Sequence, residues 1–488
     1  MEFILIIIYG TTLFFVFLYS LIQLNLVLNY CYKTAKESTS AALTKNELPK
    51  ITVQLPLYNE LYVAERLIDA VVQFDYPKDK LEVQILDDST DETVEIVAKK
   101  VNFYQQQGFH IYQHRRAKRT GYKAGALQEG LSICNGEFIA IFDADFLPQA
   151  SFLKQTLPHF KNPKLGVVQT KWEHLNRNYS LLTRLQAFGL DAHFTVEQTG
   201  RNVGNHFINF NGTAGIWRKS CIIDAGGWEA DTLTEDLDLS YRAQMRGWKF
   251  KYLQNLGSPA ELPAAMNALK NQQFRWTKGA AECAKKNLMQ VLKTTSLPIS
   301  TKVHAVFHLM NSAIFIAILL LSLLSLPMLF IKNNFEEYAL LFKLGSFFIT
   351  SVVFLGGYYL IAFLTNYQNK WKGLPRFLLL FPLFLSVSMG LSLHNALAVM
   401  EGYCGKKSAF IRTPKFNILS NKDVWKKNSY LASSINFLTV LEFFMAVYAA
   451  LGIYAAFYYS DFTLFPLHAM LFFGYGYVAF YSLLHSLR

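Results

Sequence analysis

The sequence predicts an α/β domain placed between helices that are long and apolar enough to span a membrane. Two observations predict this architecture. Apolar runs of membrane-spanning length lie at residues 3–29 and after residue 302, whereas residues 33–302 are soluble in character. Within the soluble part, short apolar strands alternate with helical stretches, which is typical of a buried parallel sheet. We therefore expect an N-terminal anchor at 1–32, a soluble domain at 33–302 and a membrane region at 303–488.

The composition agrees with a membrane protein. Of 488 residues, 52% are hydrophobic and 17% are charged, whereas ordinary soluble domains carry about 25% charge. Lys and Arg exceed Asp and Glu by 47 to 35, an excess that membrane proteins usually place in cytoplasmic loops. The five cysteines show no CxxC spacing, so neither a disulfide scaffold nor a structural zinc site is indicated. No nucleic-acid motif accompanies the basic charge, and no nucleic-acid partner is expected.

The first apolar run, residues 3–29, is long enough for one membrane span, which needs about 20 residues. Its acidic start at Glu2 and the lack of a small-residue cleavage site favour an anchor over a cleavable signal peptide. Three apolar strands are then expected at 51–55, 82–86 and 138–142. Helices are expected between and around them at 59–74, 91–107 and 122–133.

Acidic residues stand at the carboxyl ends of two expected strands, where ligands bind in such sheets. Asp143 and Asp145 follow the third strand, and an extended chain would point both carboxylates the same way, about 7 Å apart. Hard oxygen ligands of this kind suit Mg²⁺ or Mn²⁺ completed by substrate phosphates. Asp87 and Asp88 follow the second strand, and two interpretations of them are open. They form a turn that caps the next helix, or they recognise the base and ribose of a nucleotide.

No GxGxxG motif follows a strand and no P-loop is present, so the metal-bound diphosphate points to a sugar nucleotide. Two further motifs follow: Thr234-Glu235-Asp236, and QQFRW at 272–276. Alone, the first is usually a helix start with acids near the positive dipole end. Alone, the second is usually an amphipathic segment at a membrane interface.

The order of these motifs ahead of the membrane spans resembles the membrane-embedded family 2 glycosyltransferases of the cellulose synthase superfamily. Several segments look especially like the plant glucomannan and xyloglucan-backbone synthases. These segments are LDDSTD (86–91), GYKAGAL (121–127), AIFDADF (140–146), HFTVEQ (193–198), FNGTAGIWR (210–218) and QQFRW.

The resemblance implies a GT-A (Rossmann-like) catalytic domain, inverting transfer from a nucleotide sugar, a growing polysaccharide acceptor and Mg²⁺ or Mn²⁺ as cofactor. UDP-glucose is the first choice of donor and GDP-mannose the second. The implied nucleotide-sugar ligands are Glu60, Asp87, Asp88, Lys123, Asp143, Gln272 and Arg275, with Asp143 and Asp145 at the metal. The implied catalytic residues are Asp236, as the general base, and Glu235. The residues implied to bind the acceptor are Trp276, Gly215 and Trp217.

Residues 410–415 look like the FxVTxK gating segment of cellulose synthases, which implies that Phe410, Thr413 and Lys415 close over the donor. Arg412 stands where valine is usual. The segment lies in a basic loop, 401–428, which also carries Lys422, Lys426 and Lys427. A basic loop lying on anionic lipid is the simpler interpretation, but it does not account for the phenylalanine and the threonine.

The positive-inside rule keeps this basic loop in the cytoplasm. Segment 377–400 is then expected to lie along the cytoplasmic face without crossing. This leaves five spans, an outside N-terminus, an inside C-terminus and a cytoplasmic catalytic domain; six spans with a translocated basic loop are the alternative. Glu442 is a functional candidate because a charge inside an apolar span is costly.

Three functions remain open from the sequence. The first is a processive β-glycan synthase that passes its polymer through its own membrane channel. The second is a transferase that adds a single sugar to a membrane lipid such as ceramide or diacylglycerol. The third is a channel or scaffold with an inactive transferase domain, although none of the motif acids is missing.

Overall fold

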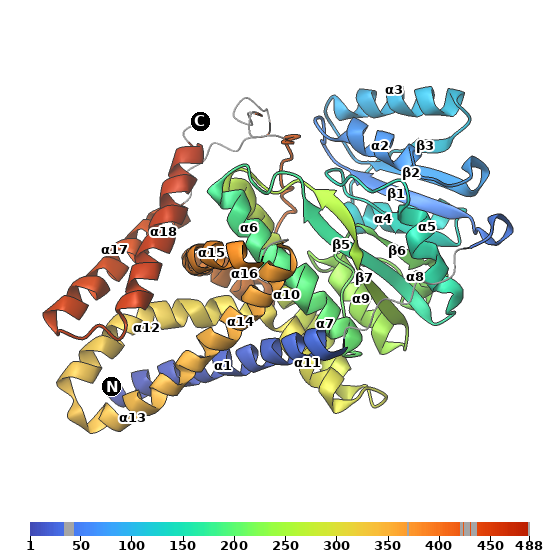
Figure 1. The fold of residues 1–488 in the computed structure, drawn as a ribbon. Coiled ribbons are helices and arrows are strands. Elements are labelled where there is room, and N and C mark those ends of the chain that lie inside the picture. The colour runs from blue at the N-terminus through green and yellow to red at the C-terminus, as the bar shows by residue number, and fades with distance from the viewer. Residues whose placement is uncertain (34–42, 368–369, 420–422, 424–429, 431–436, 487–488) are drawn as a thin grey trace.

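The computed structural model describes residues 1–33, 43–367, 370–419, 423, 430 and 437–486. Figure 1 shows two parts, a sheet-centred domain and a group of long helices beside it. Within the described part of the chain, the sheet has seven strands in the order β3-β2-β1-β4-β6-β5-β7. The strands are β1 (Ile51–Leu57), β2 (Leu81–Asp87), β3 (His110–His114), β4 (Phe138–Ile141), β5 (Leu165–His174), β6 (Gly215–Arg218) and β7 (Lys249–Ala260).

The parallel half of the sheet follows the sequence-based expectation. The three expected strands are β1, β2 and β4, and β1 pairs in parallel with both of the others. The expected helices are α2 (Ala64–Val72), α3 (Thr93–Gln106) and α4 (Tyr122–Ile133). The remaining strands were not expected. Among them, β6 runs antiparallel to β4 and β5, so the sheet is mixed, as in a GT-A fold.

Helices cover both faces of the sheet. On one face, α2, α3 and α5 (Phe152–Thr156) pack against the apolar side chains of β1, β2 and β4. On the other, α4, α8 (Lys219–Asp224) and α9 (Glu235–Met245) form a second cluster with β6 and β7. Because both faces are covered, the carboxyl ends of the parallel strands are where a ligand can approach the sheet.

Among the described residues, six helical segments are long and apolar enough to cross a membrane. They are Glu2–Lys33, Asn311–Asn334, Glu336–Thr365, Trp371–Gly390, Phe437–Tyr458 and Phe465–Ser486. The helices in them are α1 (Glu2–Lys33), α12 (Ile314–Asn334), α13 (Ala339–Gly345), α14 (Thr350–Thr365), α15 (Lys370–Gly390), α17 (Phe437–Tyr458) and α18 (Phe465–Ser486). A separate helix, α11 (Ile299–Leu309), takes up the start of the apolar region expected after residue 302.

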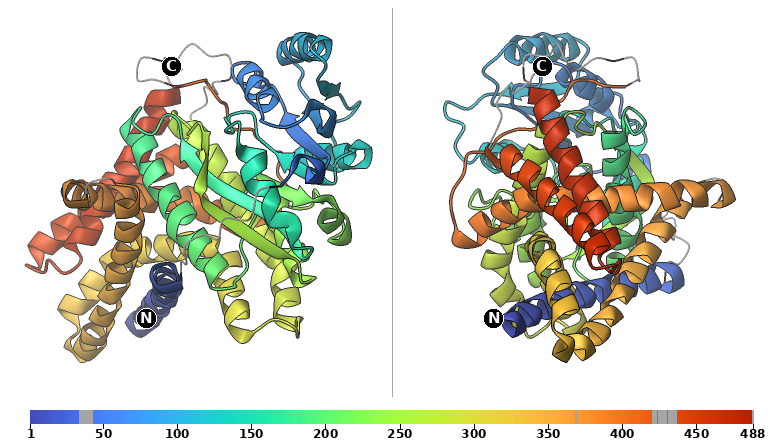
Figure 2. Two further views of the ribbon diagram at one scale, coloured as in Figure 1. Left: turned by 45° about the vertical axis from the view of Figure 1, so that its right-hand side comes forward. Right: turned by 90° about the vertical axis from the view of Figure 1, so that its left-hand side faces the viewer.

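The segment expected at 377–400 is two helices, α15 and α16 (Ser392–Cys404), and not one. Figure 1 views α15 nearly along its axis, whereas α12, α14 and α17 are seen from the side. The right-hand view of Figure 2 shows α15 from the side. This helix therefore lies across its neighbours, although its length and composition would also suit a span.

The catalytic-type domain and the membrane helices are joined through α10 (Met266–Lys293). This helix packs against α9 of the domain and against α16 and α18. Three short helical segments, α6 (Leu181–Ala192), a π-helical turn (His193–Glu197) and α7 (Gln198–Val203), form a second connection, since α7 packs against α1. The sheet and the membrane helices are therefore held in one arrangement by continuous helices.

A buried ion pair accounts for Glu442, the acidic residue inside an expected span. Its carboxylate lies 2.8 Å from Nζ of Lys270 on α10, and the two side chains are 0% and 7% exposed. Lys270 also donates to Oγ of Ser482 on α18. The pair thus fastens α17 and α18 to the helix that carries the QQFRW motif.

We expect Glu442→Gln to lower the free energy of unfolding by about 3 kcal/mol, because it leaves the ammonium of Lys270 buried without its partner. Denaturant unfolding in micelles measures this. Glu337→Gln, at an exposed position, is the matched control and should change little. Adding Lys270→Met to Glu442→Gln should recover most of the loss; equal stability of the single and double variants would contradict the account.

Candidate active site

A pocket of about 200 Å³ lies at the carboxyl ends of the central strands. Its lining brings together residues from all the motifs named above except HFTVEQ. Thirteen expected site residues line it: Glu60, Asp88, Lys123, Asp143, Asp145, Glu235, Asp236, Gln272, Arg275, Trp276, Phe410, Thr413 and Lys415. The spatial grouping of these residues is therefore as expected, although their chemical roles stay predictions.

Lys123, at the start of α4, joins three of these motifs. Its Nζ donates to Oδ1 of Asp143 at 2.5 Å and to the carbonyl of Gly212 at 2.9 Å. Gly212 has φ +78°, and a Cβ there would lie 3.0 Å from Oδ2 of Asp236. Glycine is needed because a side chain would push the Asp236 carboxylate away. Burial acts to lower the pKa of Lys123, but the carboxylates of Asp143 and Glu235 outweigh it and raise that pKa.

Glu235 and Asp236 form the first turn of α9, directly after Thr234. Carboxylates are favoured at this end of a helix by its dipole. Oδ1 of Asp236 accepts a hydrogen bond from the backbone N–H of Leu237 at 2.8 Å. Burial, reinforced by the Glu235 carboxylate, raises the pKa of Asp236 to about 7. A carboxylate that changes protonation near neutral pH is well matched to accepting a proton during a reaction.

The two carboxylates of the DAD motif do not lie on an extended chain. β4 ends at Ile141, and the N–H of Phe146 donates to the carbonyl of Asp143 at 3.1 Å, which closes a turn. The expected strand-like alternation is therefore wrong, because pairing with β1 stops before the motif. Asp143 faces Lys123, while Oδ2 of Asp145 faces Nζ of Lys415 at 2.7 Å. Both carboxylates thus face a cation, and their hard oxygens fit Mg²⁺ or Mn²⁺.

The segment 405–419 lies over the pocket. Nη2 of Arg275 donates to Oγ1 of Thr413 at 2.8 Å. The ring of Phe410 stacks on Tyr122 with centroids 5.6 Å apart. The Arg275 guanidinium lies 4.5 Å from the centroid of the Phe410 ring. With Lys415 on Asp145, the three expected residues of the gating-like segment all contact the pocket. Lys422, Lys426 and Lys427 of the same basic loop lie outside the described residues.

Two further contacts of this segment were missed by the sequence analysis. Nη1 of Arg412 lies 2.8 Å from Oε2 of Glu60. Burial raises the pKa of Glu60 to about 7, and the Arg412 guanidinium opposes that shift. The carboxylate of Glu261 accepts from the backbone N–H groups of Phe416 and Asn417, both at 2.9 Å. The departure from valine at position 412 was the signal that could have pointed to the first contact.

Three expected site residues belong to the framework of the domain, which corrects their assignment. Asp87 is 1% exposed, and its carboxylate accepts from the backbone of Ser89 and from Nε2 of Gln113. Trp217 is fully buried against aromatic rings of the second core cluster. A Cβ at Gly215 would lie 2.8 Å from the Phe210 ring. Gly215 and Trp217 lie on β6, where both residues are buried in the core of the domain. They therefore do not contact an acceptor in the pocket.

The QQFRW motif presents one face of α10 to the pocket. Gln272, Arg275 and Trp276 are spaced i, i+3 and i+4, which places them on the same side of a helix. The HFTVEQ motif supports the pocket from behind. Nε2 of His193 lies 3.2 Å from the amide of Asn211, a lining residue, and Nδ1 lies 3.0 Å from Oε2 of Glu197.

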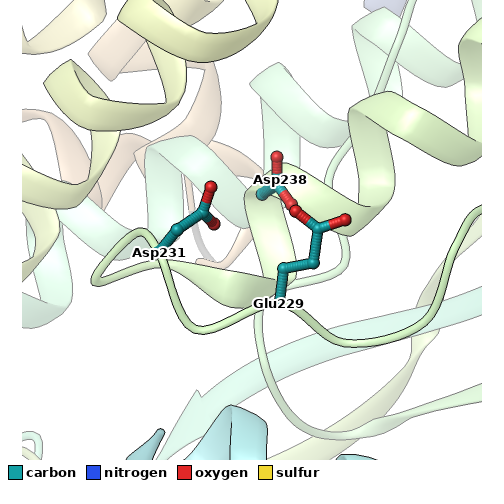
Figure 3. A group of neighbouring side chains, drawn as sticks. All are labelled: Glu229, Asp231 and Asp238. Atoms are coloured by element: carbon teal, nitrogen blue, oxygen red, sulfur yellow. The ribbon is translucent and has the colours of Figure 1, made fainter.

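Figure 3 shows a second group of acidic residues, Glu229, Asp231 and Asp238. One oxygen of each lies within 4.8 Å of the others, close enough for a shared cation. Nζ of Lys286 lies 2.6, 2.8 and 3.1 Å from their carboxylates. Lys286 and the guanidinium of Arg242 already pair with these carboxylates, so we interpret the group as an ion-pair network that fastens α9 to α10.

Comparisons with known proteins agree with this geometry. Residues 49–279 match the family described as "Glycosyltransferase like family 2". Glucomannan 4-beta-mannosyltransferase 9 of Arabidopsis thaliana is 40% identical over 270 residues, covering 54% of this chain and 51% of that protein. Glucomannan 4-beta-mannosyltransferase 1 of Cyamopsis tetragonoloba is 41% identical over 264 residues, covering 53% and 50%. The chain thus spans about half the length of these relatives.

A solved structure serves as an example of the same fold. It is the mannosyltransferase PcManGT from Pyrobaculum calidifontis in complex with GDP-Man and Mn²⁺, with a TM-score of 0.56 and 17% identity. The match covers 83% of this chain and 100% of that one. The fold described above therefore occurs in a solved structure.

Proposed function

We propose that this chain, whose residues 49–279 match the family described as "Glycosyltransferase like family 2", is a membrane-embedded processive β-glycan synthase of the cellulose synthase-like type. The observation that carries the proposal is the pocket in which Asp236, Lys123, Asp143 and Arg275 converge from four separate motifs. A carboxylate beside cationic groups is the combination that glycosyl transfer from a nucleoside diphosphate sugar requires.

In the proposed reaction, the Asp236 carboxylate takes the proton from the acceptor hydroxyl. The acceptor oxygen forms a bond to the anomeric carbon of the donor, while the bond from that carbon to the diphosphate oxygen breaks. The electron pair of the broken bond leaves with the diphosphate, whose growing charge Arg275 and Lys123 neutralise. Asp143 and Asp145 would hold Mg²⁺ or Mn²⁺, which when bound supplies further positive charge to the diphosphate.

We propose GDP-mannose as the donor, in place of the UDP-glucose that the sequence favoured. The support is that the relatives of known function are named glucomannan 4-beta-mannosyltransferases and match at about 40% identity across the catalytic-type domain. The fold-level neighbour also holds GDP-Man. A β-linked mannan or glucomannan is accordingly the proposed product.

The test supplies labelled GDP-mannose or UDP-glucose to the full chain in lipid vesicles and measures the size of the labelled product. A long polymer made from GDP-mannose supports the proposal. Polymer made from UDP-glucose alone would overturn the donor assignment. A single labelled sugar that extracts with lipid would instead support a transferase that glycosylates a membrane lipid. Absence of transfer from either donor would support a channel or scaffold with an inactive transferase domain.

We also propose that the catalytic domain is cytoplasmic, with α15 lying along the membrane surface and the other five candidate segments crossing. The support is the crosswise position of α15 and the positive-inside rule applied to the basic loop. In a variant without native cysteines, a cysteine at the exposed Ala409 should react with an impermeant thiol reagent only in inside-out vesicles. Labelling in right-side-out vesicles would contradict this topology.

Lys415→Ala should raise the KM for the donor about tenfold, because the ammonium is placed to meet the diphosphate through a charge-assisted contact. Initial rates at varied nucleotide sugar measure the effect. Lys407→Ala, an exposed lysine of the same loop, is the matched control and should leave the KM unchanged. Equal effects of the two substitutions would contradict a donor contact by Lys415 and would indicate that the loop only binds lipid.

A further inference from the structure

One side of the pocket contains polar atoms that the proposed reaction does not use. Trp172 and His174 both line the pocket and lie two residues apart on β5, which places them on the same face of the strand. Nε1 of Trp172 and Nε2 of His174 are both buried and have no hydrogen-bond partner among the described residues. The His174 side chain is 1% exposed.

The nearest charged group does not satisfy the histidine. Oδ1 of Asp191 lies 3.6 Å from Nε2 of His174, which is too far for a hydrogen bond. Both oxygens of that carboxylate instead accept from the guanidinium of Arg177, at 2.5 and 2.7 Å. Burial lowers the pKa of His174 to about 4, so its ring is neutral at pH 7.

Two unpaired polar atoms at one site are costly, since each buried group without a partner costs about 1–3 kcal/mol. Replacing them by apolar atoms would remove that cost, so their presence on a pocket wall indicates a ligand that supplies the missing partners. The indole N–H needs an acceptor, and the imidazole nitrogen needs a donor or an acceptor according to its tautomer. A hydroxyl group can act as both.

The surroundings favour a neutral, ring-shaped ligand. The Trp172 ring lies 6.5 Å from the Trp276 ring, centroid to centroid, and Leu190 adds a further apolar lining residue. The charged lining residues Lys123 and Asp143 pair with each other in the part of the pocket assigned to the donor. A pyranose ring has an apolar face that can pack on an aromatic ring and hydroxyl groups that need hydrogen-bond partners. This side of the pocket offers both an aromatic face and such partners.

We propose that Trp172 and His174 form an acceptor subsite, which holds a neutral sugar unit of the glycan next to the unit that is being extended. The proposal rests on the proposed function and deepens it by naming residues that recognise the acceptor. In this account both are positioning residues, because they touch the substrate away from the bond that forms.

Binding of oligosaccharides tests the subsite without requiring catalysis. The full chain in lipid nanodiscs is titrated by calorimetry with β-1,4-linked mannotetraose and cellotetraose. Trp172→Phe keeps an aromatic ring on Phe194 but removes the N–H together with part of the indole surface, and His174→Phe removes the imidazole nitrogens. Each is expected to weaken tetrasaccharide binding about fivefold to tenfold, the effect of one lost hydrogen bond.

Trp248→Phe is the matched control, because its Nε1 donates to Asp224 outside the pocket. It should leave sugar binding unchanged. Thermal unfolding without sugar separates binding from structure: Trp172→Phe loses the same ring volume as Trp248→Phe and should unfold at a similar temperature to that control, while His174→Phe removes an unsatisfied buried atom and should unfold no lower than the parent. A merely structural role would instead lower the unfolding temperature.

The outcomes distinguish this inference from the proposed function. Tetrasaccharide binding that is absent from the parent protein, or unchanged in both pocket variants, overturns the subsite even if the protein transfers sugar. Binding that depends on Trp172 and His174 in a protein that transfers no sugar from GDP-mannose or UDP-glucose supports the subsite and overturns the synthase proposal.

Discussion

Asp236→Asn is expected to lower the rate of sugar transfer by about 10²-fold to 10⁴-fold, the usual effect of removing a general base. Donor binding should stay nearly normal, because Lys123, Asp143 and Arg275 are untouched. The measurement is the initial transfer rate together with the donor dissociation constant. Asp79→Asn, an exposed position, serves as the matched control, and transfer at half the parental rate or more would reject the assignment.

The same residue should set the pH dependence. Burial raises the pKa of Asp236 to about 7, and only the deprotonated carboxylate can accept a proton. Below that pH, kcat/KM should therefore fall about tenfold per pH unit, and above it the rate should level off. Glu60 titrates in the same range, so Glu60→Gln is the necessary comparison: the acid limb should persist in that variant and vanish in Asp236→Asn.

Removal of divalent metal is expected to abolish transfer, with a loss of at least about 10²-fold, because charge stabilisation by a metal supplies several kcal/mol. Mn²⁺ or Mg²⁺ should restore the activity after chelation, since the pocket offers the carboxylate oxygens of Asp143 and Asp145. Asp145→Asn should raise the metal concentration needed for half-maximal rate.

The second acidic group supplies the control for the metal prediction. Glu229→Gln removes a carboxylate from the group that pairs with Lys286, and it should leave the metal requirement unchanged. Full activity in excess chelator, with no metal retained on elemental analysis, would show that Asp143 and Asp145 act without a cation.

Much of the pocket could be predicted because strand ends are local features. Apolar runs that stop at an acidic residue place Asp88 and Asp143 at one edge of a parallel sheet. The motif order then brings in Asp236 and Arg275. The same reasoning failed for Trp217, because a motif shows which residues recur together but not which of them face the core.

Contacts between residues that are far apart in the chain could not be predicted from the sequence. The Arg412–Glu60 pair joins residues that are far apart in the chain, and no periodicity records such an approach. The antiparallel β6 was missed because its four residues, which begin with a glycine and end with an arginine, form no apolar run like that of β4. Trp172 and His174 gave no motif signal either, since their importance lies in unpaired atoms that only the packed structure reveals.

The position of Lys415 has a consequence for how a cation binds. Its ammonium and a divalent ion would compete for the same carboxylate of Asp145. Metal binding and displacement of the loop are then thermodynamically linked, and the apparent metal affinity is the intrinsic one reduced by the fraction of molecules in which Asp145 is free. By reciprocity, the concentration of divalent ion sets the population of displaced loops, so Lys415→Ala should tighten metal binding while it weakens donor binding.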